Sequence, residues 1–149
     1  MLLAALALVL TFQDASGKTV KLDEPGMVYL VDFWLEGCRP CMDEMPELMR
    51  LAKDLEPGGR FKLVSVLWGD ASRGELKRIA KRNGISHAVY SDPEKWLEKV
   101  GKPVFPTKVL VRDGEIVLTR VGSLRGDRET YEYWKEKFEK ALKPSEPTH

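Results

Sequence analysis

The stretch MVYLVDFWLEGCRPCMDEMPEL, residues 27–48, decides the fold class, because it joins a strand to a helix across two cysteines. Residues 27–33 are apolar except for Asp32, as in a strand that is buried on both faces of a sheet. Apolar residues then recur at helical spacing over residues 40–55, and Pro57-Gly58-Gly59 ends that segment. The stretch therefore predicts a buried strand, a short connection that carries both cysteines, and a helix.

Strand-like and helix-like segments alternate along the rest of the chain. The expected elements are strands at 61–68, 87–92 and 106–122, and helices at 72–84, 93–101 and 127–143. Pro93 should stand at the first position of the short helix. Asp113-Gly114, the strongest hairpin signal in the chain, should split residues 106–122 into two antiparallel strands. Four apolar residues share one face of the last helix: Tyr131, Trp134, Phe138 and Leu142.

A hairpin should precede the buried strand, since the turn Asp14-Ala15-Ser16-Gly17 separates two short strand-like runs. The alternation of strands and helices, without a linker or a repeat, predicts one α/β domain over residues 1–149 with a mixed central sheet flanked by helices. At 149 residues the chain is long enough to bury a core without covalent staples.

The two ends of the chain stand apart from this pattern. Leu2–Leu10 is an uninterrupted apolar run, too short to span a bilayer but of the length of a signal-peptide core. No basic residue precedes it, so a remnant of a signal or anchor and a buried first strand both stay open. Residues 144–149 should be a frayed tail. We expect an extra-cytoplasmic setting, periplasmic or anchored and facing outward, with a cytoplasmic one left open.

The composition excludes one class of partner. The chain has 24 Lys+Arg against 23 Asp+Glu, so its net charge gives no electrostatic reason to bind nucleic acid.

Cys38 and Cys41 are the only cysteines, and a disulfide between them would close too short a loop to contribute much stability. At a helix N-terminus, however, unpaired amides and the helix dipole stabilise a thiolate, which is the form that attacks disulfides. Cys38 should be the exposed nucleophile, and Cys41 the packed thiol that resolves a mixed disulfide. Pro40 suits the first helical turn, and the positive charge of Arg39 should lower the Cys38 pKa further.

The pair has three alternative uses. It could be half of a zinc site, but there is no second CxxC, and His87 and His149 lack paired ligand spacing, so no metal is expected. It could be a structural disulfide, or two inert core residues. The short loop argues against the first of these, and the polar Arg39 between the cysteines argues against the second.

These residues resemble the active-site segment of thioredoxin-fold thiol-disulfide oxidoreductases, most of all the extra-cytoplasmic TlpA/ResA type. Residues 11–22 resemble that family's N-terminal hairpin, and 74–101 resemble its inserted helix and strand. Residues 105–122 resemble its proline loop and final hairpin. The resemblance implies a thioredoxin fold over nearly the whole chain.

The resemblance also implies roles for residues near the cysteines. Pro106 matches the family's cis-proline, which faces the CxxC, and Phe105 would offer its backbone to an incoming peptide. Trp34 matches a tryptophan near the site, with simple core packing as the alternative. Arg39 and Pro40 complete the expected substrate-binding set. Gly37 departs from the family, which usually has tryptophan before the first cysteine, so Cys38 should be more exposed.

Two acids are candidate proton acceptors for Cys41. Glu44 shares its helix face and matches a glutamate of the TlpA/ResA type, with a solvent-facing acid as the alternative. Asp32 matches the buried aspartate of plain thioredoxins, and the two acids should raise each other's pKa. Thioredoxins set a lysine from the next strand against that aspartate; residues 61–68 offer only Lys62, an uncertain replacement. Pro46 should kink the helix.

The leading hypothesis is a thiol-disulfide oxidoreductase that reduces or exchanges disulfides of protein substrates through Cys38 and Cys41, with Glu44 or Asp32 taking the Cys41 proton. The redox centre is the dithiol itself, without a cofactor. The family implies an upstream electron donor, commonly in the membrane, and a place in extra-cytoplasmic thiol maintenance or cytochrome c maturation, with the protein a monomer. The alternatives are a chaperone-like binding protein with a passive disulfide, and a thiol peroxidase. The direction of electron flow is left open.

Overall fold

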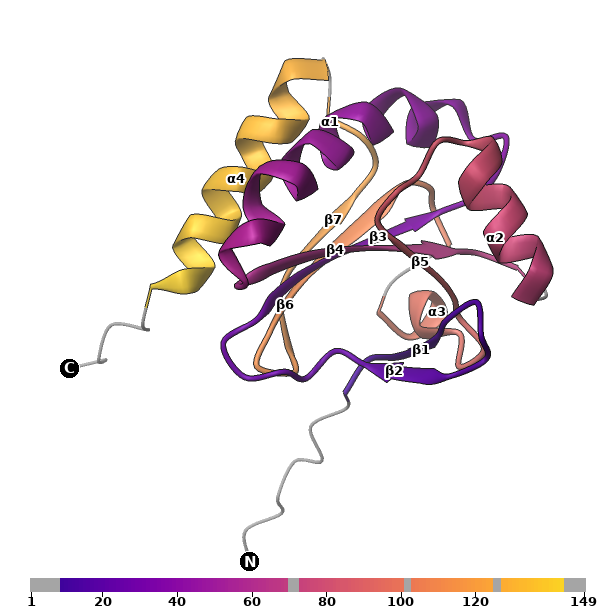
Figure 1. Cartoon of the computed structure of the whole chain (residues 1–149). Coiled ribbons are helices and arrows are strands. Elements are labelled where there is room, and N and C mark those ends of the chain that lie inside the picture. Colours follow the sequence, from indigo (N-terminus) through magenta and orange to yellow (C-terminus); the bar gives the residue numbers. More distant parts are fainter. Residues whose placement is uncertain (1–8, 70–72, 101–102, 125–126, 144–149) are drawn as a thin grey trace, which may run out of the picture.

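The computed structural model describes residues 9–69, 73–100, 103–124 and 127–143. Within them, a seven-stranded mixed sheet has the order β2-β1-β5-β4-β3-β6-β7 (Figure 1). Strands β3, β4 and β5 are parallel, and β6 runs antiparallel to β3. The strands are β1 (Thr11–Gln13), β2 (Thr19–Lys21), β3 (Val28–Trp34), β4 (Phe61–Leu67), β5 (Ala88–Ser91), β6 (Thr107–Arg112) and β7 (Glu115–Val121).

Helices cover both faces of this sheet. They are α1 (Arg39–Leu55), the 3₁₀ turn η1 (Glu56–Gly58), α2 (Arg73–Arg82), α3 (Trp96–Val100) and α4 (Asp127–Leu142). In Figure 1, α1, α2 and α4 lie on one side of the sheet, and α3 lies on the other side with the β1–β2 hairpin. We call these the α1 face and the α3 face. The arrangement confirms the predicted α/β thioredoxin-like fold.

Strand β3 occupies the centre of the sheet, and all seven of its residues are buried. Because side chains alternate along a strand, Leu30 and Trp34 join the cores beneath α1, α2 and α4. Val31 and Phe33 join the core beneath α3, where the Phe33 ring packs edge-on against Phe12 at 5.9 Å between centroids. Asp32 therefore belongs to the α1 face.

The final hairpin turns where the sequence predicted, but α3 begins later than predicted. Asp113 and Gly114 both have positive φ, 51° and 77°, as a two-residue hairpin loop requires. The prediction that the short helix starts at Pro93 is wrong, because α3 begins at Trp96. The Asp92 carboxylate accepts hydrogen bonds from the amides of Trp96 and Leu97, at 2.9 and 3.2 Å, and so caps the helix there.

The expectations for the ends of the chain fall mostly outside the described residues. The run Leu2–Leu10 overlaps the description only at Val9 and at Leu10, which is 1% exposed and accepts a hydrogen bond from the Leu22 amide. The tail 144–149 lies outside it altogether. Among the helices that the structure does describe, none has the length and apolar character needed to cross a membrane.

Candidate active site

Cys38 and Cys41 form a disulfide at the N-terminus of α1, with their Cα atoms 5.3 Å apart. Cys38 is the N-cap residue, and its Sγ accepts a hydrogen bond from the Cys41 amide at 3.3 Å. Cys38 is half-buried, whereas Cys41 is 1% exposed. The amide that bonds the Cys38 sulfur would also stabilise a Cys38 thiolate. The geometry thus divides the pair into an accessible sulfur and a buried one.

The turn before Cys38 depends on Gly37. The Cys38 amide donates to the Leu35 carbonyl at 3.2 Å, and Gly37 has a φ of +85°. A Cβ at this position would meet no atom within 4 Å, so the backbone conformation, and not crowding, selects glycine. Gly37 is therefore a structural requirement of this turn. Cys38, which follows it, is half-buried.

Pro40 lies in the first turn of α1, as predicted, and is exposed. The Arg39 side chain is 91% exposed and lies 3.9 Å from the Asp43 carboxylate. An exposed charge with an acid beside it acts weakly on a neighbouring group. We therefore assign most of the thiolate stabilisation to the helix terminus and little to Arg39.

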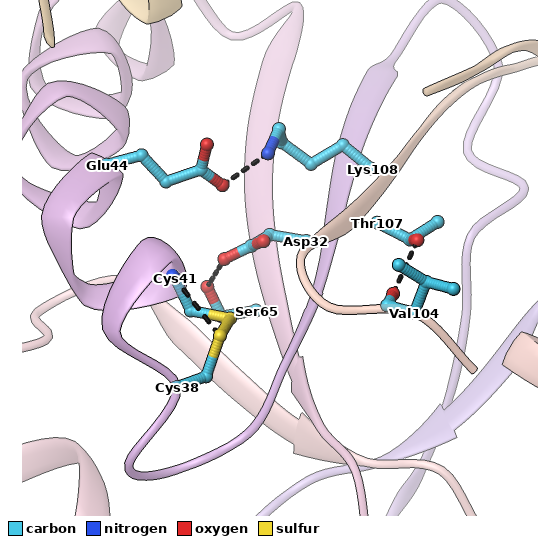
Figure 2. Close-up of polar contacts among 8 residues, drawn as sticks. All are labelled: Asp32, Cys38, Cys41, Glu44, Ser65, Val104, Thr107 and Lys108. Carbon is cyan, nitrogen blue, oxygen red and sulfur yellow. Dashed lines mark hydrogen bonds and ion pairs between the residues drawn. A yellow bond between two sulfur atoms is a disulfide. The ribbon is translucent and has the colours of Figure 1, made fainter. Parts of the chain in front are cut away.

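A row of polar side chains crosses the α1 face beneath the cysteines. Strand register places Asp32 of β3 between Ser65 of β4 and Lys108 of β6. All three are buried, at 1%, 0% and 0% exposure. The Ser65 hydroxyl donates to Asp32 Oδ2 at 3.3 Å. Figure 2 shows the Ser65 hydroxyl pointing to the Asp32 carboxylate, which itself points toward the disulfide.

Glu44 reaches the same row from α1. Its carboxylate is 3% exposed and forms an ion pair with Lys108 Nζ, so the alternative of a solvent-facing acid is wrong. In Figure 2 Glu44 points toward Lys108, whereas Asp32 points toward the cysteines. Lys108 supplies the lysine expected opposite the aspartate. Lys62 does not, because it lies on the α3 face and its Nζ donates to the Tyr90 hydroxyl at 3.3 Å.

Burial governs the protonation of both acids. It raises the pKa of Asp32 to about 7, against the opposing charge of Lys108, and the charge of Glu44 adds to the rise. Burial also raises the pKa of Glu44, while Lys108 lowers it. Glu44 thus raises the pKa of Asp32 as predicted, with desolvation the larger cause, whereas the expected effect of Asp32 on the pKa of Glu44 is not found. A carboxyl with a pKa near neutrality can accept and return a proton at working pH.

The loop before β6 presents the expected proline. The Phe105–Pro106 peptide bond is cis, and the Thr107 hydroxyl closes the loop by donating to the Val104 carbonyl at 2.7 Å (Figure 2). Phe105 and Cys38 both pack against the same core cluster, which contains Cys41. The Phe105 ring lies edge-on to Trp68, at 5.7 Å between centroids. Trp68 is 46% exposed and Val104 is 41% exposed, so apolar surface surrounds this loop.

One predicted binding residue needs correction. Trp34 is 0% exposed and packs in the core with Cys41, so it supports the site from below and cannot contact a substrate in this conformation. Pro46 lies inside α1 and is exposed.

Sequence reasoning missed Lys108, Ser65 and His87. The first two carried a signal, since each is a polar residue within an apolar strand. His87 follows α2 in a loop, and no local pattern marked it.

A mixed sheet with a CxxC disulfide at the N-terminus of a helix is the arrangement of thioredoxin-fold dithiol proteins. Comparison with solved structures supports this assignment. The thioredoxin domain of a thiol-disulfide oxidoreductase from Bacteroides vulgatus superposes with a TM-score of 0.69 at 26% identity, over 93% of this chain and 99% of that one. No protein-family profile matches the chain.

Two curated relatives extend the match to sequence. The thiol-disulfide oxidoreductase ResA of Halalkalibacterium halodurans is 28% identical over 89% of this chain and 72% of its own length. The thiol:disulfide interchange protein CycY of Rhizobium leguminosarum is 34% identical over 65% of this chain, which spans about half (51%) of that relative. The chain is a thiol-disulfide oxidoreductase of the ResA/TlpA type, as its sequence predicted.

Proposed function

We propose that this protein reduces disulfides of protein substrates outside the cytoplasm, and that a membrane-bound dithiol donor returns it to the reduced form. The names of its relatives support thiol-disulfide exchange as the reaction. Resemblance to the TlpA/ResA type supports the setting, and within it thiol maintenance or cytochrome c maturation. The observation that carries the proposal is the division of the pair into an accessible Cys38 and a buried Cys41 above an acid.

The reaction begins with the dithiol form. The Cys38 thiolate attacks one sulfur of the substrate disulfide, and the other sulfur leaves as a thiolate. Cys41 then loses its proton and attacks the Cys38 sulfur, which releases the second substrate thiolate and forms the Cys38–Cys41 disulfide. Two electrons pass from the protein to the substrate. The donor dithiol reverses these steps and is itself oxidised to a disulfide.

Asp32 is the proton acceptor that best fits the geometry. Its carboxylate points toward the disulfide, and its pKa of about 7 leaves it partly ionised at neutral pH (Figure 2). Glu44 holds Lys108, which lies directly across from Asp32 in the sheet. We therefore give Glu44 the task of fixing Lys108, whose positive charge favours the ionised Asp32.

The substrate lies along the Phe105-Pro106 loop in this proposal. The backbone there would pair with an extended peptide, as in other cases of strand addition. Exposed Trp68 and Val104 beside Phe105 favour an apolar side chain near the reacting cysteine of the substrate. Arg39 and Pro40 follow Cys38 directly and are both exposed.

The test compares variants of the two cysteines with a variant of Asp32. Cys38→Ser should abolish reduction of insulin, because no accessible thiolate remains. Cys41→Ser should still attack and then accumulate the mixed disulfide, which mass spectrometry detects. Asp32→Asn should slow the second, resolving step by about 10²-fold near neutral pH, the usual range for a lost proton acceptor. The scheme is wrong if Cys38→Ser keeps the wild-type rate, or if Cys41→Ser forms no adduct.

The reduction potential decides the direction of electron flow. A reductant should have a value near that of thioredoxin, about −270 mV, and an oxidant a value near about −120 mV. Equilibration with glutathione buffers measures it. A value at the oxidising end would reverse the proposed direction while leaving the roles of the cysteines unchanged.

A further inference from the structure

The connection from β3 to α1 is fastened to the C-terminal end of α2, beside which it passes in Figure 1. Residues 35–38 form this connection, and Glu36 stands two residues before Cys38. The Arg82 guanidinium donates two hydrogen bonds to the Glu36 carboxylate, at 2.8 Å from Nε and 2.6 Å from Nη2. The Asn83 amide donates a third at 3.1 Å. We call these three residues the Glu36 clamp.

The α2 end of the clamp is itself fixed. Arg82 is the last residue of α2, and the Asn83 side chain also donates to the Ile79 carbonyl at 2.8 Å, which caps the helix. Leu76 of the same helix is 2% exposed and packs in the core cluster that contains Cys41. Glu36 is therefore tied to the part of the molecule that also supports the buried cysteine.

The Cys38 end of the clamp has little other support. Glu36 and Gly37 are exposed, and the φ of +85° at Gly37 belongs to a residue with wide backbone freedom. In the oxidised protein the disulfide also fixes the Cys38 sulfur at the start of α1. Reduction removes this covalent link. The clamp and the turn bond from the Cys38 amide to the Leu35 carbonyl, at 3.2 Å, then hold Cys38.

We propose that the Glu36 clamp keeps the Cys38 thiolate at the N-terminus of α1, which makes Glu36 a positioning residue for the nucleophile. The proposal deepens the proposed function and rests on it, because Cys38 is there the attacking thiolate. At this position the sulfur accepts a hydrogen bond from the Cys41 amide at 3.3 Å. A thiolate gains from this amide and from the helix dipole only while it stays there.

Loss of the clamp should therefore affect the two redox forms unequally. The reduced form loses thiolate stabilisation, whereas the disulfide holds the Cys38 sulfur in the oxidised form. A form that is destabilised becomes less populated, so the reduction potential should become more negative. The bonds are two parallel ones and a third to an exposed carboxylate, a geometry in which such a pair does contribute. We expect the ratio of reduced to oxidised protein to fall about threefold, which corresponds to about 14 mV.

A pure effect of charge would give another pattern. The Arg82 guanidinium, and after it the Asn83 amide, hold the pKa of Glu36 below its ordinary value, so the carboxylate is ionised at neutral pH. Removal of Arg82 would leave this negative charge near Cys38, disfavour the thiolate and lower the potential. Removal of Glu36 would favour the thiolate and raise the potential. Positioning predicts that both changes lower it.

The experiment measures the reduction potentials of Glu36→Ala, Arg82→Ala and the double variant in glutathione buffers at about pH 7. Glu36→Ala breaks all three bonds of the clamp and should give the full shift of about threefold. Arg82→Ala keeps the Asn83 bond and should give a smaller shift in the same direction. The double variant should match Glu36→Ala, because the clamp is already lost. Glu136→Ala is the matched control, an exposed acid on α4 that is ion-paired to Lys140 at 2.9 Å, and it should leave the potential unchanged.

Three outcomes would overturn the proposal. Shifts of opposite sign in the two single variants, cancelling in the double variant, would assign the effect to charge. Unchanged potentials would mean that the clamp supports the fold equally in both redox forms. Should Arg82→Ala fail to fold, Glu36→Ala decides by itself, since only a more negative potential agrees with positioning.

Failure of the proposed function has a separate signature. If Cys38→Ser reduces insulin at the wild-type rate, the dithiol mechanism is wrong, and the role of the Glu36 clamp is wrong with it. If Cys38→Ser is inactive and the potentials contradict positioning, only the inference about the clamp is wrong.

Discussion

The two faces of the central sheet are equally buried but differ in chemistry. On the α3 face, Val31, Val64 and Val109 form a core whose buried members are apolar or aromatic. On the α1 face, the corresponding layer holds Asp32, Ser65 and Lys108. Both sets come from the same three neighbouring strands, one residue apart. Strand alternation thus places these buried polar side chains on the face that α1 and its cysteines cover, and leaves the opposite face to stabilise the fold.

This difference predicts that substitutions on the two faces separate stability from reactivity. A change on the α3 face should alter the free energy of unfolding at every pH and leave sulfur exchange unaffected. A change on the α1 face should make stability depend on pH, because the cost of a buried charge depends on its protonation.

Lys108→Met should have the largest effect. It leaves Glu44 and Asp32 buried without their cation, which typically costs about 3–5 kcal/mol. The loss should be greater at about pH 8 than at about pH 5. Without the lysine, the two buried acids stay protonated to higher pH in the folded variant than in the unfolded chain, so rising pH favours unfolding. Urea unfolding at both pH values measures it. The double variant Lys108→Met/Glu44→Gln should recover part of the loss, and equal losses at both pH values would contradict the assignment.

Asp32→Asn should stabilise the oxidised protein. The pKa of Asp32 is about 7 when folded, against about 3.9 when unfolded. The carboxyl therefore lowers stability as the pH rises from about 4 through 7, and the asparagine should raise the unfolding free energy by about 2–4 kcal/mol at about pH 8 and little at about pH 4. Thermal unfolding across this range checks the sign. An equal gain in unfolding free energy at both ends of this pH range would mean that titration of Asp32 is not the cause.

Val31→Ala tests the α3 face. It removes buried apolar atoms from a residue at 0% exposure and should cost about 2 kcal/mol. The cost should be the same at about pH 5 and about pH 8, and the folded protein should reduce insulin at the wild-type rate. An altered pH profile of the reaction would show that the two faces are not independent.

Gly37→Ala lies outside both faces and should have the smallest effect. The left-handed φ of +85° strains an alanine, at a cost of about 1 kcal/mol, although its Cβ meets no neighbour. Chemical denaturation measures the cost. Gly26→Ala, at a φ of +79° and equally open, is the matched control for stability. A change in Cys38 reactivity in the Gly37 variant alone would show that this turn also controls the reactivity of the Cys38 thiol.

The sequence predicted those features that depend on neighbouring residues. The buried strand, the cysteine-bearing helix start and the Asp113-Gly114 loop each follow from a few consecutive side chains. The predicted start of α3 at Pro93 was wrong. The preference of proline for a first helical turn indicates a start at Pro93, but capping by Asp92, one residue earlier, sets the start at Trp96.

The missing part of the site depends on contacts that are distant in sequence. Lys108 lies 76 residues after Asp32, and only the antiparallel register of β6 with β3 brings them together. Lys62 was considered because thioredoxins draw their lysine from the next strand, but strand alternation turns it to the α3 face. His87 meets Ser65 only because β5 lies beside β4. Such pairings need the order of strands, which no local pattern contains.

The short N-terminal hairpin affects how copies of the protein behave toward one another. β1 pairs with β5 at Gln13 and Ser91, and thereby covers the end of β5 on the side away from β4. An open strand edge is a template for strand addition by another molecule. The hairpin should therefore limit strand addition between copies of the protein at this end of β5.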